Sequence, residues 1–294
     1  MSESWLNLEG KTVIVTGGAS GIGKAVAQGF LNAGSNVVIS DMAPEAPEMD
    51  EAAGKLLYVK TDVTKVADVE AMVEKAKETF GTIDVLVNNA GGALKMPEGG
   101  FEKMPMEYWE SQINLNLNAP AYFAHYAMQN MIEHGTKGSI INISSVHSQV
   151  TWVRRKTLPY TAAKAGLNMF TKNLGIEAIH YGIHVNGIAP GFIATKATDR
   201  YDQSDLERGF LRKIPAGFLG NVDDIVPMIL FLANNDTNRF LVGETIVIDG
   251  GQSVDGAIDK MLDDGNPVNA FDIKVDMENY IKPTKAELEE KEKK

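Results

Sequence analysis

Thr12–Gly23 reads TVIVTGGASGIG, a short β-branched run followed by a glycine-rich turn, and helical spacing of apolar residues begins at its end. Gly17 permits a tight turn, Gly21 lets the backbone approach a pyrophosphate, and Gly23 permits close packing of the next helix. The first turn of that helix offers unpaired N–H groups and a partial positive charge. The stretch therefore predicts a strand, a phosphate-binding turn and a helix.

The glycine signal has a structural alternative. Three residues separate the first two glycines and one separates the last two, which departs from the G-x-G-x-x-G pattern. Glycine turns between a strand and a helix are also common without any ligand. The glycines alone therefore do not establish a phosphate-binding turn, and the rest of the chain must decide between the two interpretations.

The same unit of strand, turn and helix recurs along the sequence. Strand-like runs are expected at 12–15, 37–39, 56–59, 83–87, 139–143, 184–188 and 245–248. Helices are expected at about 21–33, 65–79, 106–133, 160–180, 203–212 and 222–233. The strand runs are apolar on both faces, as a parallel sheet covered by helices on both sides requires. The pattern predicts an α/β fold with a doubly wound, seven-stranded parallel sheet.

No break in composition divides residues 1–253, which we interpret as one domain. Residues 254–294 show neither the strand nor the helix spacing of apolar residues, and we interpret them as a C-terminal extension. Its last eleven residues, ending in EEKEKK, are expected to be a frayed, solvated tail. The segment 268–281 contains enough apolar residues to dock either on its own subunit or on a neighbouring one. Both alternatives remain open.

Composition narrows the classes of function. The 28 Lys and Arg against 39 Asp and Glu give a net charge of −11, which disfavours nucleic acid and anionic membranes as partners. The absence of cysteine excludes disulfides and thiolate metal sites and suits a reducing compartment. No signal peptide or stretch of membrane-spanning length is evident, so a cytoplasmic protein that binds a small molecule is expected.

The second expected strand ends at Asp41, eighteen residues beyond Gly23. A carboxylate there can accept hydrogen bonds from an adenosine ribose and repels a 2′-phosphate. Ser20 and Met42 occupy the positions where a basic residue would favour the phosphorylated cofactor. The sequence favours NAD over NADP, although Asp41 could also be an ordinary turn residue.

Further motifs recur after the fourth and fifth expected strands. They are Asn88-Asn89-Ala90-Gly91, Ser144-Ser145 and Tyr160-Thr161-Ala162-Ala163-Lys164. Together with TGGASGIG they resemble the classical short-chain dehydrogenase/reductase family over roughly residues 8–253. The resemblance implies a Rossmann-like core, a nicotinamide-dependent oxidoreductase and a homo-oligomer, tetramer or dimer, assembled through the long helices. It implies no metal.

The resemblance also implies a set of cofactor-binding residues. These are Gly17, Ser20, Gly21, Ile22, Gly23, Asp41, Asp62, Val63, Asn89, Ala90, Gly91, Tyr160, Lys164, Pro190, Gly191, Ile193 and Thr195. Among them, Asp62 and Val63 would meet the adenine, and Thr195 would contact the nicotinamide carboxamide or cap a helix.

The resemblance assigns catalysis to Asn116, Ser145, Tyr160 and Lys164. Asn116 is chosen because it follows Trp109 by seven residues and precedes a leucine, whereas Asn114 and Asn118 lie about 200° around a helix from it. The i, i+4 spacing of Tyr160 and Lys164 places them on one helix face. We expect the ammonium, helped by the positive nicotinamide ring of the oxidised cofactor, to lower the phenol pKa by about two to three units from its usual ~10. Tyr160 would then move the proton, Ser145 would position the substrate oxygen, and Asn116 would hold a water beside Lys164.

The sequence Ser-Ser-Val-His with a downstream tryptophan resembles the glucose dehydrogenase branch, which suggests a small sugar or polyol converted from alcohol to ketone, or lactol to lactone. Candidate substrate residues are His147, Trp152, Arg154 and Arg155, the two arginines suiting an acidic group. The 15-residue gap from Ser145 to Tyr160 is longer than the family's and puts the loop geometry in doubt. Alternatives are a ketoacyl or steroid carbonyl reductase, or a catalytically silent NAD-sensing scaffold.

Overall fold

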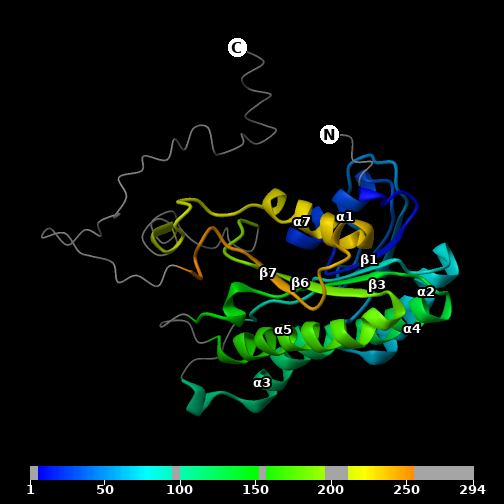
Figure 1. Cartoon of the computed structure of the whole chain (residues 1–294). Helices are drawn as coiled ribbons and strands as arrows, with labels where there is room; N and C mark the ends of the chain where they lie inside the picture. Colours follow the sequence, from blue (N-terminus) through cyan, green and yellow to red (C-terminus); the bar gives the residue numbers. More distant parts are fainter. Residues whose placement is uncertain (1–5, 95–99, 152–156, 196–210, 255–294) are drawn as a thin grey trace, which may run out of the picture. The chain divides into compact units, whose positions relative to one another are not determined.

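The computed structural model describes residues 6–94, 100–151, 157–195 and 211–254. The chain divides into two units, Met1–Val254 and Asp255–Lys294. All described residues belong to the first unit, and Figure 1 draws these residues in colour. The expected C-terminal extension beyond residue 254, with its possible docking segment, lies outside them, as does most of the helix expected at 203–212.

Seven parallel strands form one sheet in the order β3-β2-β1-β4-β5-β6-β7. The strands are β1 Thr12–Thr16, β2 Asn36–Asp41, β3 Leu56–Lys60, β4 Val85–Asn88, β5 Ser139–Ile143, β6 His184–Pro190 and β7 Thr245–Ile248. The order reverses beside β1, where β4 pairs with the opposite edge of β1 from β2. The predicted doubly wound, Rossmann-like fold is confirmed, and its reversal point is where such sheets bind ligands.

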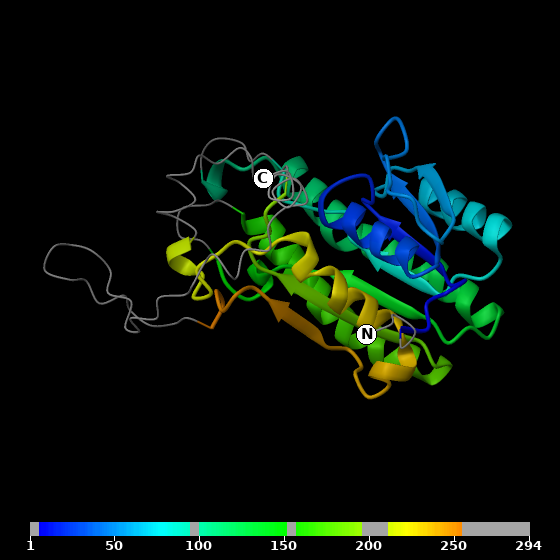
Figure 2. The same ribbon diagram turned by 90° about the horizontal axis from the view of Figure 1, so that it is seen from above.

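Helices cover both faces of the sheet (Figure 1). On one face lie α1 (Gly21–Asn32) and α7 (Val226–Ala233), seen above the sheet in Figure 2. On the other lie α2 (Val66–Phe80), α4 (Ala119–Glu133) and α5 (Leu158–Ala178). Shorter elements are α3 (Met106–Ile113), α8 (Asn235–Asn238) and single 3-10 turns at Phe101–Lys103, Val146–Ser148, Ile179–Tyr181, Leu211–Lys213 and Val222–Asp224.

The two faces of the sheet have separate apolar cores. Val13 and Val15 of β1 pack with α1 and α7, whereas Ile14 between them packs with α2 and α4. Because successive side chains of a strand point to opposite faces, each strand must be apolar at every position to fill both cores. All five residues of β1 are accordingly buried.

The single helix predicted at 106–133 is wrong in one respect. A π-helical turn, Asn114–Asn118, separates α3 from α4, and the N–H of Ala119 bonds to the carbonyl of Asn114, five residues earlier. In a regular helix residue 120 would donate to the carbonyl of Asn116, but Pro120 has no N–H and its ring crowds that carbonyl. The proline explains why the helix widens here.

Candidate active site

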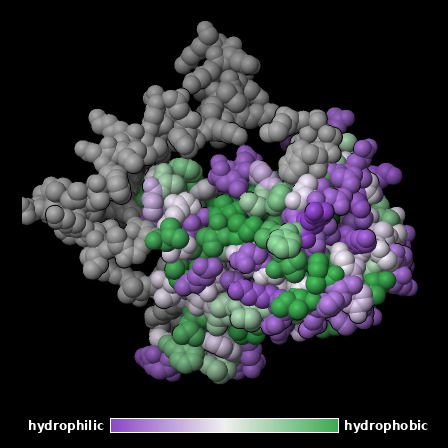
Figure 3. All heavy atoms as spheres, in the orientation of Figure 1, coloured by the Kyte–Doolittle hydropathy of each residue, from purple (hydrophilic) through white to green (hydrophobic). Residues whose placement is uncertain are grey.

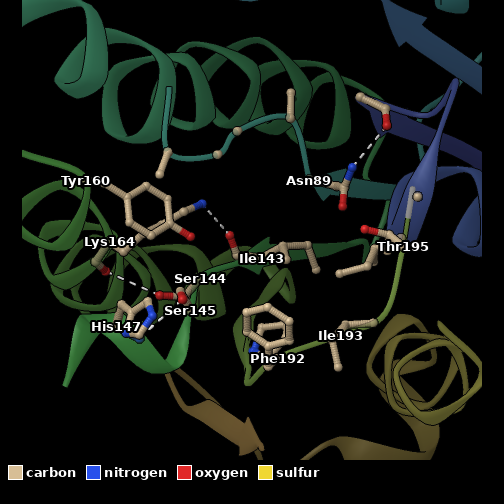
Figure 4. Close-up of a pocket in the computed structure, with 18 of the residues that line it drawn as sticks. Asn89, Ile143, Ser144, Ser145, His147, Tyr160, Lys164, Phe192, Ile193 and Thr195 are labelled. Atoms are coloured by element: carbon tan, nitrogen blue, oxygen red, sulfur yellow. Dashed lines mark hydrogen bonds between the residues drawn. The ribbon is translucent and has the colours of Figure 1, made fainter. Parts of the chain in front are cut away.

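A cavity of about 460 Å³ opens at the carboxyl ends of the central strands. It is lined by Gly17, Ser20, Gly21, Ile22, Asp41, Asn89, Ala90, Gly91, Gly92, Ala93, Ile143, Ser144, Ser145, His147, Thr157, Tyr160, Lys164, Pro190, Gly191, Phe192, Ile193 and Thr195. Figure 4 shows Tyr160, Ser145 and His147 on one side, with Asn89 and Thr195 on the other. Most of the residues predicted from separate motifs therefore meet in one place.

The glycine turn after β1 leaves no room for side chains. Gly17 has φ +64°, and a Cβ built on it would lie 2.9 Å from the Cα of Ala90. A Cβ on Gly23 would lie 2.2 Å from the carbonyl oxygen of Gly17. Ser20 stands at the N-cap of α1 with extended backbone, and its side chain makes no capping hydrogen bond. The turn and the helix N-terminus thus form the cradle that a pyrophosphate requires.

The end of β4 is fastened to this turn. The Asn89 amide donates to the carbonyls of Thr16 (2.9 Å) and Gly17 (3.1 Å). The Thr16 hydroxyl in turn accepts from the N–H groups of Asn89 (3.0 Å) and Ala90 (2.9 Å). Asn88 is buried and bonds instead to Asn142 of the neighbouring strand. Asn89 therefore sets the shape of the turn while lining the cavity.

The end of β2 places Asp41 at the cavity. Its two carboxylate oxygens accept from the N–H groups of Ala19 and Ala43, each at 3.0 Å. The carboxylate is therefore held in a fixed orientation, and each oxygen keeps a lone pair for another donor.

Asp62 and Val63 are not brought into the cavity. The Asp62 carboxylate accepts from the Thr64 hydroxyl at 2.6 Å and forms an ion pair with Lys65 at 3.3 Å. These contacts lower the pKa of Asp62, the Thr64 hydrogen bond most strongly. Val63 is buried in the core beneath α2. Their predicted position after β3 is right, but their side chains are engaged elsewhere.

Ser145, Tyr160 and Lys164 form the opposite wall. Ser145 directly follows the short loop after β5, and the other two stand one turn apart on α5. The hydroxyls of Tyr160 and Ser145 are hydrogen-bonded to each other. The Lys164 ammonium donates to the carbonyl of Ile143 at 2.7 Å and lies 5.9 Å from the centre of the Tyr160 ring (Figure 4).

The protein groups alone do not lower the pKa of Tyr160. Burial raises the pKa of Tyr160, and the hydrogen bond from Ser145 offsets only part of that rise. Burial also lowers the pKa of Lys164 to about 8. The reason is common to both groups: loss of water disfavours each charged form, and one ammonium several ångströms from the ring does not overcome it.

Asn116 is fully buried and does not line the cavity. Its side chain accepts from the N–H of Gly92 (2.9 Å) and donates to the carbonyls of Gly92 and Gln112 (3.1 Å each). A Cβ built on Gly91 would lie 2.8 Å from the Asn116 side-chain oxygen and 3.3 Å from the Lys164 ammonium, so both groups lie against Gly91.

The neighbouring asparagines face elsewhere. Asn114 and Asn118 are hydrogen-bonded to each other at 3.4 Å, and Asn114 donates to the carbonyl of Thr64 at 3.3 Å. The prediction that both point away from Asn116 is confirmed. The π turn that carries all three was missed, although Pro120 was a visible signal for it.

The loop after β6 closes the remaining side. A Cβ on Gly21 would meet the methyl group of Thr195 at 3.7 Å, so this loop reaches the phosphate turn. Phe192 and Thr157 also line the cavity; the sequence placed them in loops expected to form substrate walls, 192–212 and 146–158, without singling them out. His147 lines the cavity and donates its backbone N–H to the Ser145 hydroxyl at 3.2 Å. Trp152, Arg154 and Arg155 lie outside the described residues.

The described residues form neither a metal site nor a membrane-spanning helix. No group of three or more His, Asp or Glu side chains is placed to hold a metal ion. No described helix has the length and apolar character needed to cross a bilayer.

Known proteins are similar to this chain along most of its length. The family model described as Enoyl-(Acyl carrier protein) reductase matches residues 17–253. Glucose 1-dehydrogenase 2 of Bacillus subtilis is 34% identical over 256 residues, covering 84% of this chain and 96% of that protein. The 3beta-hydroxysteroid dehydrogenase 1 of Eggerthella lenta is 33% identical over 255 residues, with 84% and 95% covered.

Solved structures agree with the fold. A 7 alpha-hydroxysteroid dehydrogenase complexed with NADH and 7-oxo glycochenodeoxycholic acid is 30% identical, with a TM-score of 0.78 and 85% of this chain and 97% of that chain covered. A short-chain type dehydrogenase/reductase from Mycobacterium marinum is 28% identical with a TM-score of 0.78, covering 84% and 97%. The chain therefore belongs to the classical short-chain dehydrogenase/reductase family, and it is an NAD(P)-dependent oxidoreductase acting on CH–OH groups.

Proposed function

We propose that this protein interconverts a secondary alcohol and a ketone, or a lactol and a lactone, with NAD as the cofactor. The observation that carries the proposal is the pairing of Ser145, Tyr160 and Lys164 on one wall of a cavity with the glycine cradle of Gly17–Gly23 on another. A protein that only binds a dinucleotide needs the cradle but not the hydroxyl pair backed by a buried ammonium.

In the oxidative direction Tyr160 takes the proton of the substrate hydroxyl, and Ser145 holds the substrate oxygen within its reach. A nicotinamide held beside this wall would supply the hydride acceptor and, when oxidised, a positive charge that favours the phenolate form of Tyr160 together with Lys164. Lys164 also suits the cofactor's ribose hydroxyls, because its ammonium carries three donors.

Asn116 supports proton exit from Lys164. The two amide hydrogens of its side chain are used by the carbonyls of Gly92 and Gln112. A water can still donate to the side-chain oxygen, which keeps a lone pair beside the bond from Gly92, or to the main-chain oxygen, to which Pro120 has no N–H to offer. We propose that a water at one of these oxygens links Lys164 to solvent.

The choice of NAD rests on Asp41. Its fixed carboxylate lines the cavity, and its negative charge repels a 2′-phosphate. The following residue, Met42, is 63% exposed and offers no positive charge. The described residues at this corner thus favour a free ribose.

We favour a small sugar-like or polyol-like substrate, which the relative named glucose 1-dehydrogenase supports. A hydroxysteroid-type substrate is the second candidate, supported by relatives of that name. The test is a panel of sugars, polyols and hydroxysteroids with NAD, followed at the absorbance of NADH. Turnover of sugars or polyols supports the first candidate, and turnover of steroids alone supports the second. NADH binding without any turnover would instead identify a silent sensor.

We further propose that residues 1–253 form the catalytic domain of a homo-oligomer, a tetramer or a dimer. Met169 and Ile176 on α5 are 58% and 66% exposed, and Phe240 before β7 is fully exposed. Figure 3 shows hydrophobic residues gathered in the middle of the face it views. Light scattering after size-exclusion chromatography tests this, and a monomer at micromolar concentration would reject it.

A further inference from the structure

Three residues of α5 form a stripe along the loop that carries Ser145. Tyr160, Lys164 and Asn168 are spaced by four residues, so they share one helix face. Tyr160 is hydrogen-bonded to Ser145, and Lys164 donates to the carbonyl of Ile143. The third member, Asn168, has no part in the mechanism derived above.

The Asn168 side chain is hydrogen-bonded to a residue before Ser145 and to a residue after it. Its side-chain oxygen accepts from the hydroxyl of Ser144, the residue before Ser145. Its amide donates to the hydroxyl of Ser148 at 2.7 Å, and that hydroxyl donates to the carbonyl of Ser145 at 2.6 Å. One carboxamide therefore connects α5 to the residue before Ser145 and, through Ser148, to the main chain of Ser145 itself.

The segment that Asn168 holds has little structure of its own. It is one 3-10 turn, Val146–Ser148, and such a turn has weak hydrogen-bond geometry. Ser144 and Ser145 are buried, so their polar groups depend on protein partners rather than on bulk water. Ser144 also donates to the carbonyl of Lys164 at 3.3 Å, which ties the same loop to the helix that presents Tyr160. The loop that carries Ser145 and the helix that carries Tyr160 are thus joined by one hydrogen-bond network.

We infer that Asn168 is a positioning residue for Ser145: by binding Ser144 and Ser148 it fixes the Ser145 hydroxyl against Tyr160. Its effect on turnover rests on the proposed function, but its effect on the loop does not. Small displacements of a catalytic group have large kinetic consequences, so the carboxamide should matter although it does not line the cavity.

The kinetic test compares Asn168→Leu, which removes both hydrogen bonds, with Asn168→Asp, which keeps the acceptor for Ser144 and loses the donor to Ser148. We expect kcat to fall about tenfold to a hundredfold in Asn168→Leu and less in Asn168→Asp. The dissociation constant for NADH should stay within about twofold, because the glycine cradle is untouched. Asn32→Leu, the same change at an exposed position of α1, is the matched control.

A double-mutant cycle shows whether Asn168 acts through Ser145. In a Ser145→Ala background, Asn168→Leu should lower kcat no further, because residues that act as a unit are not additive. A second, independent loss would overturn the inference, and so would a wild-type kcat in the single variant.

Hydrogen exchange provides a readout that needs no turnover. Peptides covering residues 144–149 should exchange faster in Asn168→Leu than in wild type or Asn32→Leu, since the N–H of Ser148 bonds to the Ser145 carbonyl at 2.9 Å only while the turn is held. Unchanged exchange would overturn the inference. If the wild-type enzyme oxidises no alcohol, the proposed function fails, whereas the exchange comparison still decides the role of Asn168.

Discussion

The wall of the cavity after β1 and β4 is made of glycines and main-chain atoms, whereas the wall after β5 and along α5 is made of buried polar side chains. At the first wall a Cβ on Gly17 or Gly23 would meet backbone atoms closer than 3.0 Å. At the second, Ser145 and Lys164 are 7% and 3% exposed and bond to partners in the protein. The first wall leaves space for a ligand to approach the backbone. The second wall removes water from the polar and charged side chains that line it.

This difference predicts opposite sensitivities. The glycine wall should tolerate changes of charge nearby but not an added methyl group, because packed interiors have no room for one. The α5 wall should tolerate small changes of volume but not the loss of a polar atom, because buried polar groups depend on specific partners.

The largest effect is expected from Tyr160→Phe, which removes one oxygen and keeps the ring. Loss of a general acid–base group lowers turnover by about 10²- to 10⁴-fold. NADH affinity should change little, because the cradle lies on the other wall. Steady-state kinetics and fluorescence titration of NADH measure the two, and Tyr181→Phe, at a 54% exposed position, is the control. Full activity in Tyr160→Phe would remove the proposed mechanism.

Lys164→Met tests the energetic cost of the α5 wall. Burial lowers the pKa of Lys164 from 10.5 to about 8, so the ammonium destabilises the fold at neutral pH by about 3 kcal/mol. Loss of the hydrogen bond to Ile143 costs the variant about 1 kcal/mol of stability, which offsets part of this gain. Lys164→Met should therefore be inactive but about 2 kcal/mol more stable than wild type at pH 7.

The pH dependence of the same variant has a definite sign. Between about pH 8 and 10.5 the unfolded chain keeps the lysine proton and the folded chain loses it, so wild-type stability rises with pH and the advantage of Lys164→Met shrinks. Urea unfolding at pH 7 and pH 10 measures this, with Lys172→Met at an exposed position of α5 as control. A variant less stable at both values by the same amount would contradict it.

Gly17→Ala tests the glycine wall against a matched position. Gly17 and Gly135 both have φ +64°, so alanine costs about 1 kcal/mol of backbone strain at either. Only at Gly17 does the new methyl group meet the Cα of Ala90, at 2.9 Å, whereas Gly135 has nothing within 4 Å. The extra overpacking of about 1–3 kcal/mol should appear in Gly17→Ala alone, as weaker NADH binding or lower stability. Equal effects would mean that the close approach is unimportant.

The fold and the glycine wall were predictable because their causes are local. A strand buried on both faces must read as an unbroken apolar run, as residues 12–15 do, and a glycine required by crowding is visible as a glycine. Asp41 and Asn89 follow from their place at strand ends. The helix break at Asn114–Asn118 was also local, since Pro120 cannot continue the hydrogen-bond ladder, but its effect on register was missed.

The α5 wall was predictable in its residues and not in its energetics. The four-residue spacing gives the shared face of Tyr160 and Lys164 but says nothing of their burial, which decides the direction of both pKa values. Likewise Asp62 has the expected place after β3, but the sequence did not predict the contacts of its carboxylate with Thr64 and Lys65. Such outcomes depend on partners far apart in the sequence or on competing side chains.

Asp41→Asn gives the smallest expected effect and sharpens the comparison, because it changes charge at the glycine wall without adding volume. The amide keeps one acceptor oxygen, for the N–H of Ala19 or that of Ala43, and loses the other of these two hydrogen bonds, so the loop keeps one of its two attachments to residue 41. Without the negative charge, repulsion of a 2′-phosphate weakens, and the ratio of kcat/KM for NAD to that for NADP should fall about tenfold, or about 1.4 kcal/mol. Asp50→Asn, at an exposed position, should leave the ratio unchanged. If Asp41→Asn also leaves it unchanged, Asp41 only shapes the turn, and cofactor choice must arise elsewhere in the cavity.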